Sequence, residues 1–197
     1  MSNLIAIGKY IPGTVILREE INGTTGLEFL DRIFFVTDGI MLSQIREIAG
    51  VDGSTLQNWV KRGWVGNAKN KRYSKDQLAR ILIINMLRSS MQLENIDFLL
   101  RYINGTIDDA TDDIIPESML YEYVCRIIDR IAPTGGPCNM TREELRKVIA
   151  EQTSDYEDKD EGASVRLRAA LEIIIIAYFA SLLTAYSAEL YGSLNKE

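Results

Sequence analysis

The sequence predicts a mainly α-helical protein whose C-terminal part is a helical bundle with one long helix. Two observations predict this class: apolar residues recur at three- and four-residue intervals along most segments, and clusters of Gly, Pro and Asn separate these segments. A third is that the 197 residues, 46% of them hydrophobic and 25% charged, are enough to bury a sizeable core.

The chain divides into three parts by charge, although its net charge is −6. Residues 1–39 carry three basic and five acidic side chains, residues 40–88 carry nine and three, and residues 89–197 carry ten and twenty. The net charges are therefore −2, +6 and −10. This segregation is typical of a protein whose basic part meets nucleic acid, and a solvated helix face is the alternative interpretation.

Residues 1–39 are expected to be an N-terminal extension. The opening "MSNLIAIGKYIPG" has one Lys before a short apolar patch that Gly-Lys interrupts, so we expect no secretory signal and a cytoplasmic protein. "YIPGTVIL", residues 10–17, predicts either a short strand or an extended arm. "GLEFLDRIFF", residues 26–35, predicts a helix.

Residues 40–104 begin with a pattern of two short helices. "LSQIREIA", residues 42–49, predicts a helix, "GVDG" a tight turn, and "STLQNWVKRGW", residues 54–64, a second helix. Ser54 is the expected N-cap of the second helix, with Gln57 completing a capping box. Two helices joined by a short Gly-containing turn make a helix-turn-helix, in which the second helix enters the major groove of DNA.

The next segment, "VGNAKNKRYSKDQL" at residues 65–78, predicts a wing, meaning a small basic β-hairpin beside the second helix. Its Gly and Asn residues allow the turn, Tyr73 is expected to pack the wing onto the core, and Ser74 caps the following helix. Further helical stripes cover residues 78–86 and 93–103.

The residues expected to contact DNA come from the second helix and the wing. Asn and Gln can make paired hydrogen bonds to adenine, Arg and Lys bind guanine or phosphate, and a basic wing binds phosphates. The expected contacts are Thr55, Gln57, Asn58, Lys61, Arg62, Lys69, Lys71, Arg72 and Tyr73. An ordinary polar helix face is the alternative interpretation of the helical members of this set.

This order of elements resembles the MerR-like winged helix-turn-helix domain of MerR-type regulators. The positions that match the family pattern are Thr55, Leu56, Trp59, Gly63, Tyr73, Leu78, Leu93, Ile96 and Leu99. The chain also resembles uncharacterised Firmicute proteins that carry this domain after an N-terminal extension. It departs from the MerR pattern because residues 1–39 precede the domain and because Gln57 and Asn58 stand where Arg and Tyr are usual.

Residues 105–197 are expected to form an acidic helical bundle and dimerisation region. Breaker segments separate three predicted helices, at residues 117–131, 141–152 and 163–194. The last helix contains sixteen uncharged residues, 173–188, which predict a buried core or interface helix rather than the alternative of a membrane anchor. We expect a homodimer through residues 163–194 and no membrane association.

The acidic part offers two further alternatives. An unknown small-molecule effector could bind inside the bundle between tyrosines, although core packing is the favoured role of these residues: Tyr121, Tyr123, Tyr178 and Tyr186. The loop at residues 104–116 holds four aspartates that lack the spacing of a Ca²⁺ loop, which favours a solvated acidic loop: Asp108, Asp109, Asp112 and Asp113.

Several classes of chemistry are not expected. The chain has no His, and Cys125 and Cys138 have the wrong context for a metal site, so we expect reduced thiols and no cofactor. A phosphate-cradling Gly-rich loop and a Ser/His or Cys/His pair are also missing from the sequence, so we expect no enzyme.

The sequence leaves two functions open. The resemblance over residues 40–104 implies a dimeric transcriptional regulator that binds specific sequences in duplex DNA. The alternative is a protein-interaction or adaptor module that keeps the fold without binding DNA, which the acidic balance and the residues at positions 57 and 58 would suit.

Overall fold

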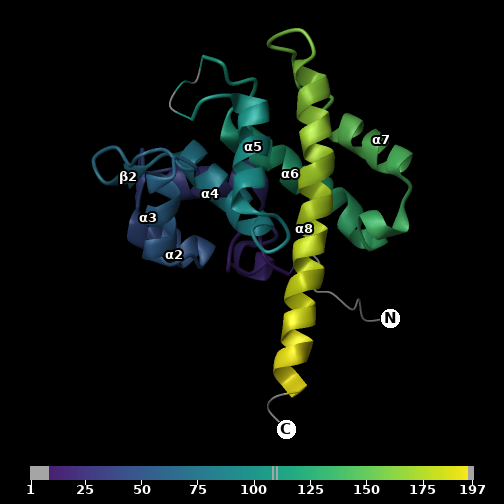
Figure 1. Cartoon of the computed structure of the whole chain (residues 1–197), viewed down its shortest axis with the longest axis horizontal. Coiled ribbons are helices and arrows are strands. Elements are labelled where there is room, and N and C mark those ends of the chain that lie inside the picture. Colours follow the sequence, from purple (N-terminus) through teal and green to yellow (C-terminus); the bar gives the residue numbers. More distant parts are fainter. Residues whose placement is uncertain (1–8, 108, 110, 195–197) are drawn as a thin grey trace.

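The computed structural model describes residues 9–107, 109 and 111–194, and it is mainly helical, as the sequence predicts (Figure 1). The expectation for the first eight residues, and the place of Asp108 in its loop, lie outside the described residues. The α-helices of the described part are α1 Gly26–Phe34, α2 Leu42–Ala49, α3 Gly53–Lys61, α4 Lys75–Leu87, α5 Leu93–Asn104, α6 Glu117–Ile131, α7 Arg142–Gln152 and α8 Ala163–Leu194. Short 3-10 helices are η1 Arg18–Ile21, η2 Ala132–Thr134 and η3 Pro137–Asn139, and the strands are β1 Ile40–Met41 and β2 Arg72–Tyr73.

Helix α4 lies at the centre of the fold and contacts α1, α2, α5, α6 and α8. Its residues are buried nearly all the way round, from Leu78 to Leu87 with Asn85 half-buried. A helix without a polar face is stable only when other elements surround it. The apolar side chains of all three charge segments consequently join one hydrophobic cluster, which runs from Ile11 to Phe179.

The N-terminal extension packs into this core. Tyr10 and Leu17 form one antiparallel bridge, so residues 10–17 turn back on themselves. Helix α1 packs against α6. The Tyr121 hydroxyl of α6 donates a hydrogen bond to the Pro12 carbonyl at 2.8 Å, and Ile11 is fully buried.

Helix α3 begins earlier than expected, and the prediction of Ser54 as its N-cap is wrong. Asp52 is the N-cap, and its carboxylate accepts a hydrogen bond from the Thr55 backbone N–H at 2.9 Å. The hydroxyls of Ser54 and Thr55 also donate to Asp52. A carboxylate is preferred at this position because its charge complements the positive end of the helix dipole.

Helix α3 also ends before the predicted Trp64. Gly63 takes a left-handed backbone conformation, with φ of +71°, and two hydrogen bonds close the end of the helix: Gly63 N–H to the Val60 carbonyl and Trp64 N–H to the Trp59 carbonyl. This is the Schellman arrangement, which glycine favours because it lacks a Cβ. The chain therefore turns inward, and Trp64 and Val65 are buried.

The other predicted helices are confirmed with small changes at their ends. Ser74 caps α4 in a capping box with Gln77, as the sequence predicts. The predicted breakers are confirmed: they correspond to the loop before α6, to the segment with two short 3-10 helices before α7 and to the loop before α8.

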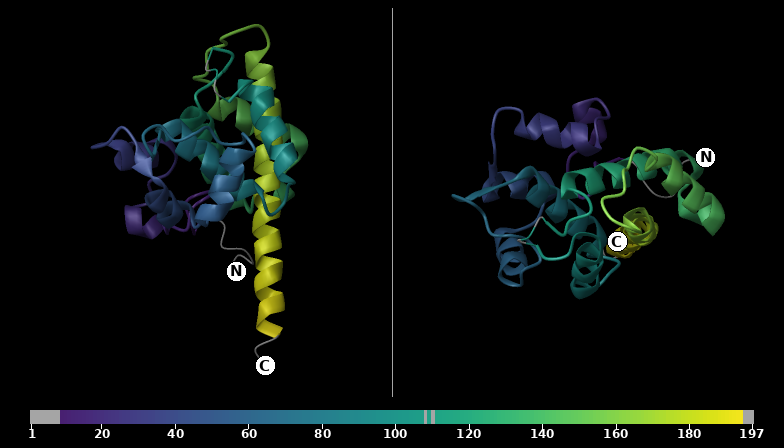
Figure 2. Two further views of the ribbon diagram at one scale, coloured as in Figure 1. Left: turned by 60° about the vertical axis from the view of Figure 1, so that its left-hand side comes forward. Right: turned by 90° about the horizontal axis from the view of Figure 1, so that it is seen from above.

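Helix α8 spans residues 163–194, as predicted. Its first part is packed against α4, α5, α6 and α7, whereas the residues beyond Ser181 are exposed or half-buried. The C-terminal part projects from the body of the molecule (Figures 1 and 2). By length and composition alone α8 could cross a membrane, but half of its most apolar window is buried inside the protein, and core helices meet the same criterion.

The capping arrangement predicts a pH-dependent effect of Asp52→Ala on stability. Hydrogen bonds from Ser54 and Thr55 hold the pKa of the Asp52 carboxyl well below its usual range. Because the folded-state pKa is lowered, the ionised Asp52 carboxylate stabilises the folded state fully above its unfolded-state pKa, which is near 4. This stabilisation is lost as the pH falls further. Asp52→Ala should therefore lower the Tm at pH 7 and do so progressively less as the pH falls below 4.

Thermal unfolding followed by circular dichroism measures this difference, and Ser54→Ala is the matched control. The Ser54 hydroxyl only donates to Asp52, so its removal should change the Tm less than Asp52→Ala does. An equal or larger effect of Ser54→Ala at pH 7 would contradict the assignment of the N-cap.

Candidate functional site

The outer face of α3 carries polar side chains. Leu56 and Trp59 are buried, whereas Gln57, Asn58 and Lys61 are exposed. At 100° per residue, these three exposed positions lie on the side of the helix opposite the two buried ones. The packing of α3 therefore presents amide and ammonium groups to solvent.

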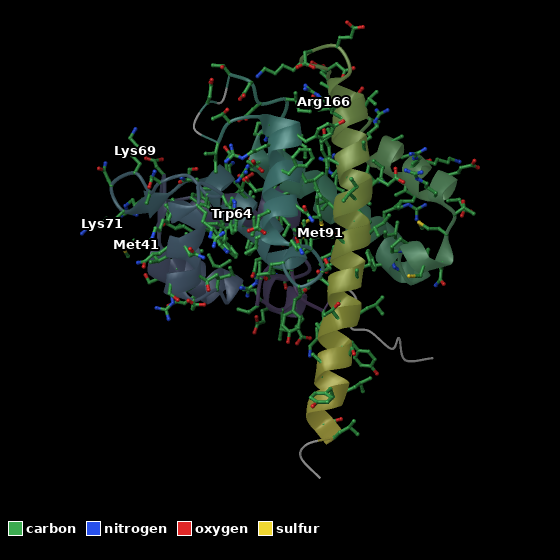
Figure 3. All side chains as sticks on the ribbon, viewed as in Figure 1. Met41, Trp64, Lys69, Lys71, Met91 and Arg166 are labelled. Carbon is green, nitrogen blue, oxygen red and sulfur yellow. The ribbon has the colours of Figure 1, made fainter. Side chains whose placement is uncertain are left out.

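A tight hairpin follows α3 and presents further cations. The backbones of Lys69 and Arg72 exchange two hydrogen bonds of 2.9 Å, so Asn70 and Lys71 are the two residues of the turn. Both have positive φ, +52° and +60°, which is the conformation of a type I′ hairpin turn. Lys69 and Lys71 point outward at the tip of this hairpin (Figure 3).

The returning strand of the hairpin is anchored to β1. Ile40 pairs with Tyr73, and Met41 pairs with Arg72. Arg72 Nη1 also donates a hydrogen bond to the Gly39 carbonyl at 2.8 Å, which draws its guanidinium back toward β1. The Tyr73 side chain is only 7% exposed and belongs to the hydrophobic core.

The structure divides the nine predicted contact residues into two groups. Gln57, Asn58, Lys61, Lys69 and Lys71 are exposed, and in the described part of the chain no ion pair or side-chain hydrogen bond engages the three lysines. We call these five residues the outer polar surface.

The other four predicted residues already have partners in the protein. The Thr55 hydroxyl donates to Asp52 at 2.6 Å, Arg72 is held by Gly39, and Tyr73 is buried. Arg62 lies 3.5 Å from Glu94 and 5.1 Å from the ring centre of Trp64. Any role of these four in binding would be to position the outer polar surface or to exchange one partner for another.

The positions of two other basic residues, Arg46 and Arg80, do not follow from the count of charges in the sequence. Arg46 is exposed, and its Cδ lies 3.7 Å from the position that a Cβ on Gly53 would occupy, so it stands beside the start of α3. Arg80 is buried, with 5% exposure. Its position in the middle of "LARILIINML" is the sequence signal for burial, because α4 has no polar face to present it to solvent.

The residues that the structure describes enclose a groove and a cavity that could hold a ligand. A groove of about 670 Å³ between η3, α7 and α8 is mostly apolar, and Arg142 and Arg146 pair with Glu172 at its edge. A second, more polar cavity of about 490 Å³ includes Arg80, Asn104 and Glu117 in its wall.

The tyrosines that could have lined an effector pocket line neither of these cavities. Tyr121, Tyr123 and Tyr178 are buried in the core, and Tyr186 is half-buried on α8. Within the described residues, no group of three or more acidic or Cys side chains is arranged to hold a metal ion.

Comparison with known proteins finds one matching family model and a distant relative. Residues 29–124, from α1 to α6, match a domain of unknown function, DUF1836. The chain is 25% identical over 146 residues to the uncharacterized protein YkrK of Bacillus subtilis (strain 168), covering 70% of this chain and 62% of that protein. The chain thus spans less than two thirds of its relative's length. No solved structure matches the chain significantly.

These matches confirm the part of the sequence-based prediction that concerned uncharacterised Firmicute proteins. The DUF1836 match covers just under half of the chain and includes the outer polar surface, the hairpin and α4.

The hairpin turn predicts opposite effects of two glycine substitutions on stability. Lys71 has positive φ, which costs a residue with a Cβ roughly 1 kcal/mol or more, whereas glycine adopts it freely. Lys71→Gly should therefore raise the free energy of unfolding by a few tenths to about 1 kcal/mol. Urea denaturation of the full chain measures this change.

Lys69→Gly is the matched control because it removes the same charge at a position with ordinary backbone conformation. It should lower the free energy of unfolding by roughly 0.5–1 kcal/mol. A loss of stability in Lys71→Gly equal to that in Lys69→Gly would contradict the type I′ turn.

Proposed function

We propose that the protein is a dimeric, MerR-like winged helix-turn-helix regulator that binds duplex DNA through α3 and the hairpin. The observation that carries this proposal is the outer polar surface itself. It places Lys61, Lys69 and Lys71 without protein partners in the described chain, beside exposed Gln57 and Asn58, in a protein whose net charge is −6. Three such lysines on a helix and on the hairpin that follows it are suited to an anionic partner, and the two amides are suited to reading bases.

The backbone of the hairpin supports the same conclusion. A lysine at a position of positive φ is less stable than a glycine there, so its presence favours a role for its charge. Hairpins of this kind can reach the phosphate backbone while the preceding helix occupies the major groove, which is about 12 Å wide.

The position of Asp52 limits how α3 would contact DNA. Its carboxylate lies at the N-terminus of α3, where it would repel a phosphate and already complements the helix dipole. We therefore place the base contacts at Gln57, Asn58 and Lys61 in the middle and end of α3, and the phosphate contacts at the hairpin.

Helix α7, from the segment 89–197, would lie away from DNA in this arrangement. Helix α7 lies across α8 from α3 and the hairpin (Figure 1 and the right view of Figure 2). Residues 89–197 have a net charge of −10, and like charge would hold them away from phosphates.

A seam on α8 favours a second copy of the chain as its partner. Residues at alternating intervals of three and four line one side of the helix: Ile173, Ile176, Ala180, Leu183, Ser187, Leu190 and Leu194. The five large apolar members are 46–72% exposed. A 3.5-residue repeat of apolar residues is the pattern by which two helices pack as a coiled coil, so we assign this seam to the homodimer.

Binding to DNA is tested with duplexes selected by the full-length protein from a random pool. We expect log Kd to vary steeply with log salt concentration, and Lys71→Ala or Lys69→Ala each to reduce the slope by about one and weaken binding to all sequences. Fluorescence anisotropy at several salt concentrations measures both quantities. Asn58→Ala should instead relax the preference for particular bases.

Lys147→Ala is the control. Lys147 is exposed on α7, and its substitution removes the same charge far from the hairpin. Its slope should equal that of the wild type. If no duplex is retained even at low salt, DNA binding is refuted. If Lys69→Ala and Lys147→Ala behave alike, binding through the hairpin is refuted. A protein partner that remains bound after Lys69, Lys71 and Lys61 are all neutralised would favour the adaptor alternative.

The dimer is tested by charges placed on the seam of α8. Leu183→Glu combined with Leu190→Glu would bury two carboxylates in the interface, so we expect the protein to become monomeric. Sedimentation equilibrium measures the molecular mass. The control is Ala185→Glu with Ala188→Glu, which adds the same charges at exposed positions about 160° away around the helix. Dissociation by the control pair alone, or a monomeric wild type, would contradict the seam.

A further inference from the structure

A polar cavity lies between the start of α4, the end of α5 and the start of α6. Its volume is about 490 Å³, which is within the range of small-molecule sites. Gly66 and Gln77 at one side belong to the base of the hairpin and to α4, and Lys159 at the other side comes from the loop before α8. The cavity thus touches both the basic and the acidic parts of the chain.

The two cations of the cavity wall are already occupied. The Arg80 guanidinium donates to the Trp64 carbonyl at 2.7 Å, pairs with Glu117, and lies 3.4 Å from Asp97. Lys159 Nζ donates to the carbonyls of Thr111 and Asp113. Arg80 is therefore not available to a further carboxylate without losing an existing partner, and the two hydrogen bonds of Lys159 go to neutral carbonyls.

Two buried polar atoms at the cavity have no hydrogen-bond partner within the described residues. They are Glu117 Oε2 and Asn104 Nδ2, and their residues are 9% and 3% exposed. Burial raises the pKa of the Glu117 carboxyl, and Asn104 lowers it as a side-chain hydrogen-bond donor would, but the two atoms lack the geometry of a full hydrogen bond. An unpaired buried carboxylate oxygen is costly, so its presence at a cavity indicates a ligand that supplies the missing donor.

The charge of the cavity wall specifies the kind of ligand. Asp76, Asp113 and Glu117 contribute three carboxylates against the two cations. Burial, together with Asp112, raises the pKa of Asp113, and burial raises that of Glu117. Both carboxyls would gain from a nearby positive charge.

A metal ion does not fit this wall, because no group of three or more carboxylates or thiolates in the described residues converges closely enough to hold one. Apolar side chains stand beside the carboxylates, namely Ile107, Ile115 and Pro116. Carboxylates next to an apolar wall suit a cation that carries hydrocarbon.

We propose that this cavity binds a small organic ammonium ion. Its N–H groups would donate to Glu117 Oε2 and to the Asp113 carboxylate, and its carbon chain would lie against Ile107 and Ile115. Asn104 Nδ2 would donate to an oxygen of the ligand or to a water molecule beside it. Aliphatic polyamines and basic amino acids both have this chemistry.

The cavity is connected to the hairpin through two of its own residues. Arg80 holds the Trp64 carbonyl, and Gln77 Nε2 donates to the Asn67 carbonyl at 3.0 Å. A cation at Glu117 would compete with Arg80 for the same carboxylate and so alter the support of the hairpin. This coupling rests on the proposed function, whereas binding of the ligand does not.

The site is tested by thermal unfolding and calorimetric titration of the full chain with putrescine, spermidine, L-lysine and L-arginine, in the absence of DNA. We expect at least one ammonium to raise the Tm and bind, and 1,4-butanediol and L-norleucine, which lack the side-chain ammonium, to have no effect. A response to putrescine or spermidine alone would identify polyamines as the source, and a response to the amino acids alone would identify basic amino acids.

Two variants of the cavity keep this test independent of folding. Asp113→Asn leaves the Arg80 ion pair intact, and Glu117→Gln keeps the shape of the side chain; each should weaken binding by about tenfold or more. Glu143→Gln, an exposed glutamate of α7, should bind like the wild type. Absence of binding by all four ammonium probes at millimolar concentration, or wild-type affinity in both cavity variants, would overturn the proposal.

A separate titration of selected DNA with and without the bound ammonium tests the coupling. Failure of DNA binding alone would leave the ligand site in place, and failure of ligand binding alone would leave the proposed function in place.

Discussion

The buried guanidinium of Arg80 is the interaction on which the arrangement of this protein depends. It connects the carbonyl of Trp64, just after α3, with Glu117 at the first turn of α6 and with Asp97 of α5. Removing one member of such a buried group leaves the others without partners in a medium of low polarity, which typically costs about 3–5 kcal/mol. The direction in which the chain leaves α3, and hence the position of the hairpin, is thereby tied to the helices of the acidic part.

The central position of α4 also joins the three parts of the chain, through apolar packing. Its apolar side chains contact helices from the N-terminal extension, from the segment with the outer polar surface and from the acidic part. Asn85 adds polar links, since its amide donates to the carbonyls of Gly13 and Ala49. Helix α4 therefore joins α1, α2, α5, α6 and α8 in one continuous core.

The charge distribution and the fold have to be considered together. Nine basic residues in 40–88 predict a strongly positive surface, but Arg80 is internal, and Arg62 and Arg72 are held by protein partners. The lysines of this segment for which the described residues show no partner lie on α3 and on the hairpin: Lys61, Lys69 and Lys71. The positive charge that is free for an outside partner is therefore smaller than the count of nine implies.

The sequence by itself determined the helical class, the approximate limits of most helices and the hairpin, because these depend on local periodicity, capping residues and turn residues. Ser74 and Gln77 around the start of α4 are examples, since their hydrogen bonds join residues three apart. The limits of α3 were less accurate, because Asp52 and Ser54 are both good capping residues and only the path of the turn decides between them.

Only the tertiary structure decided which candidate residues face solvent and which are occupied. Arg62 and Arg72 are ordinary basic residues of one segment in the sequence, but Glu94 and the Gly39 carbonyl, which lie far from them along the chain, are their partners in the structure. The cavity at Glu117 and Asn104 and the exposure of the α8 seam likewise depend on contacts between separated elements. Burial and pairing are properties of the assembled core, and residue spacing along the chain contains no direct measure of them.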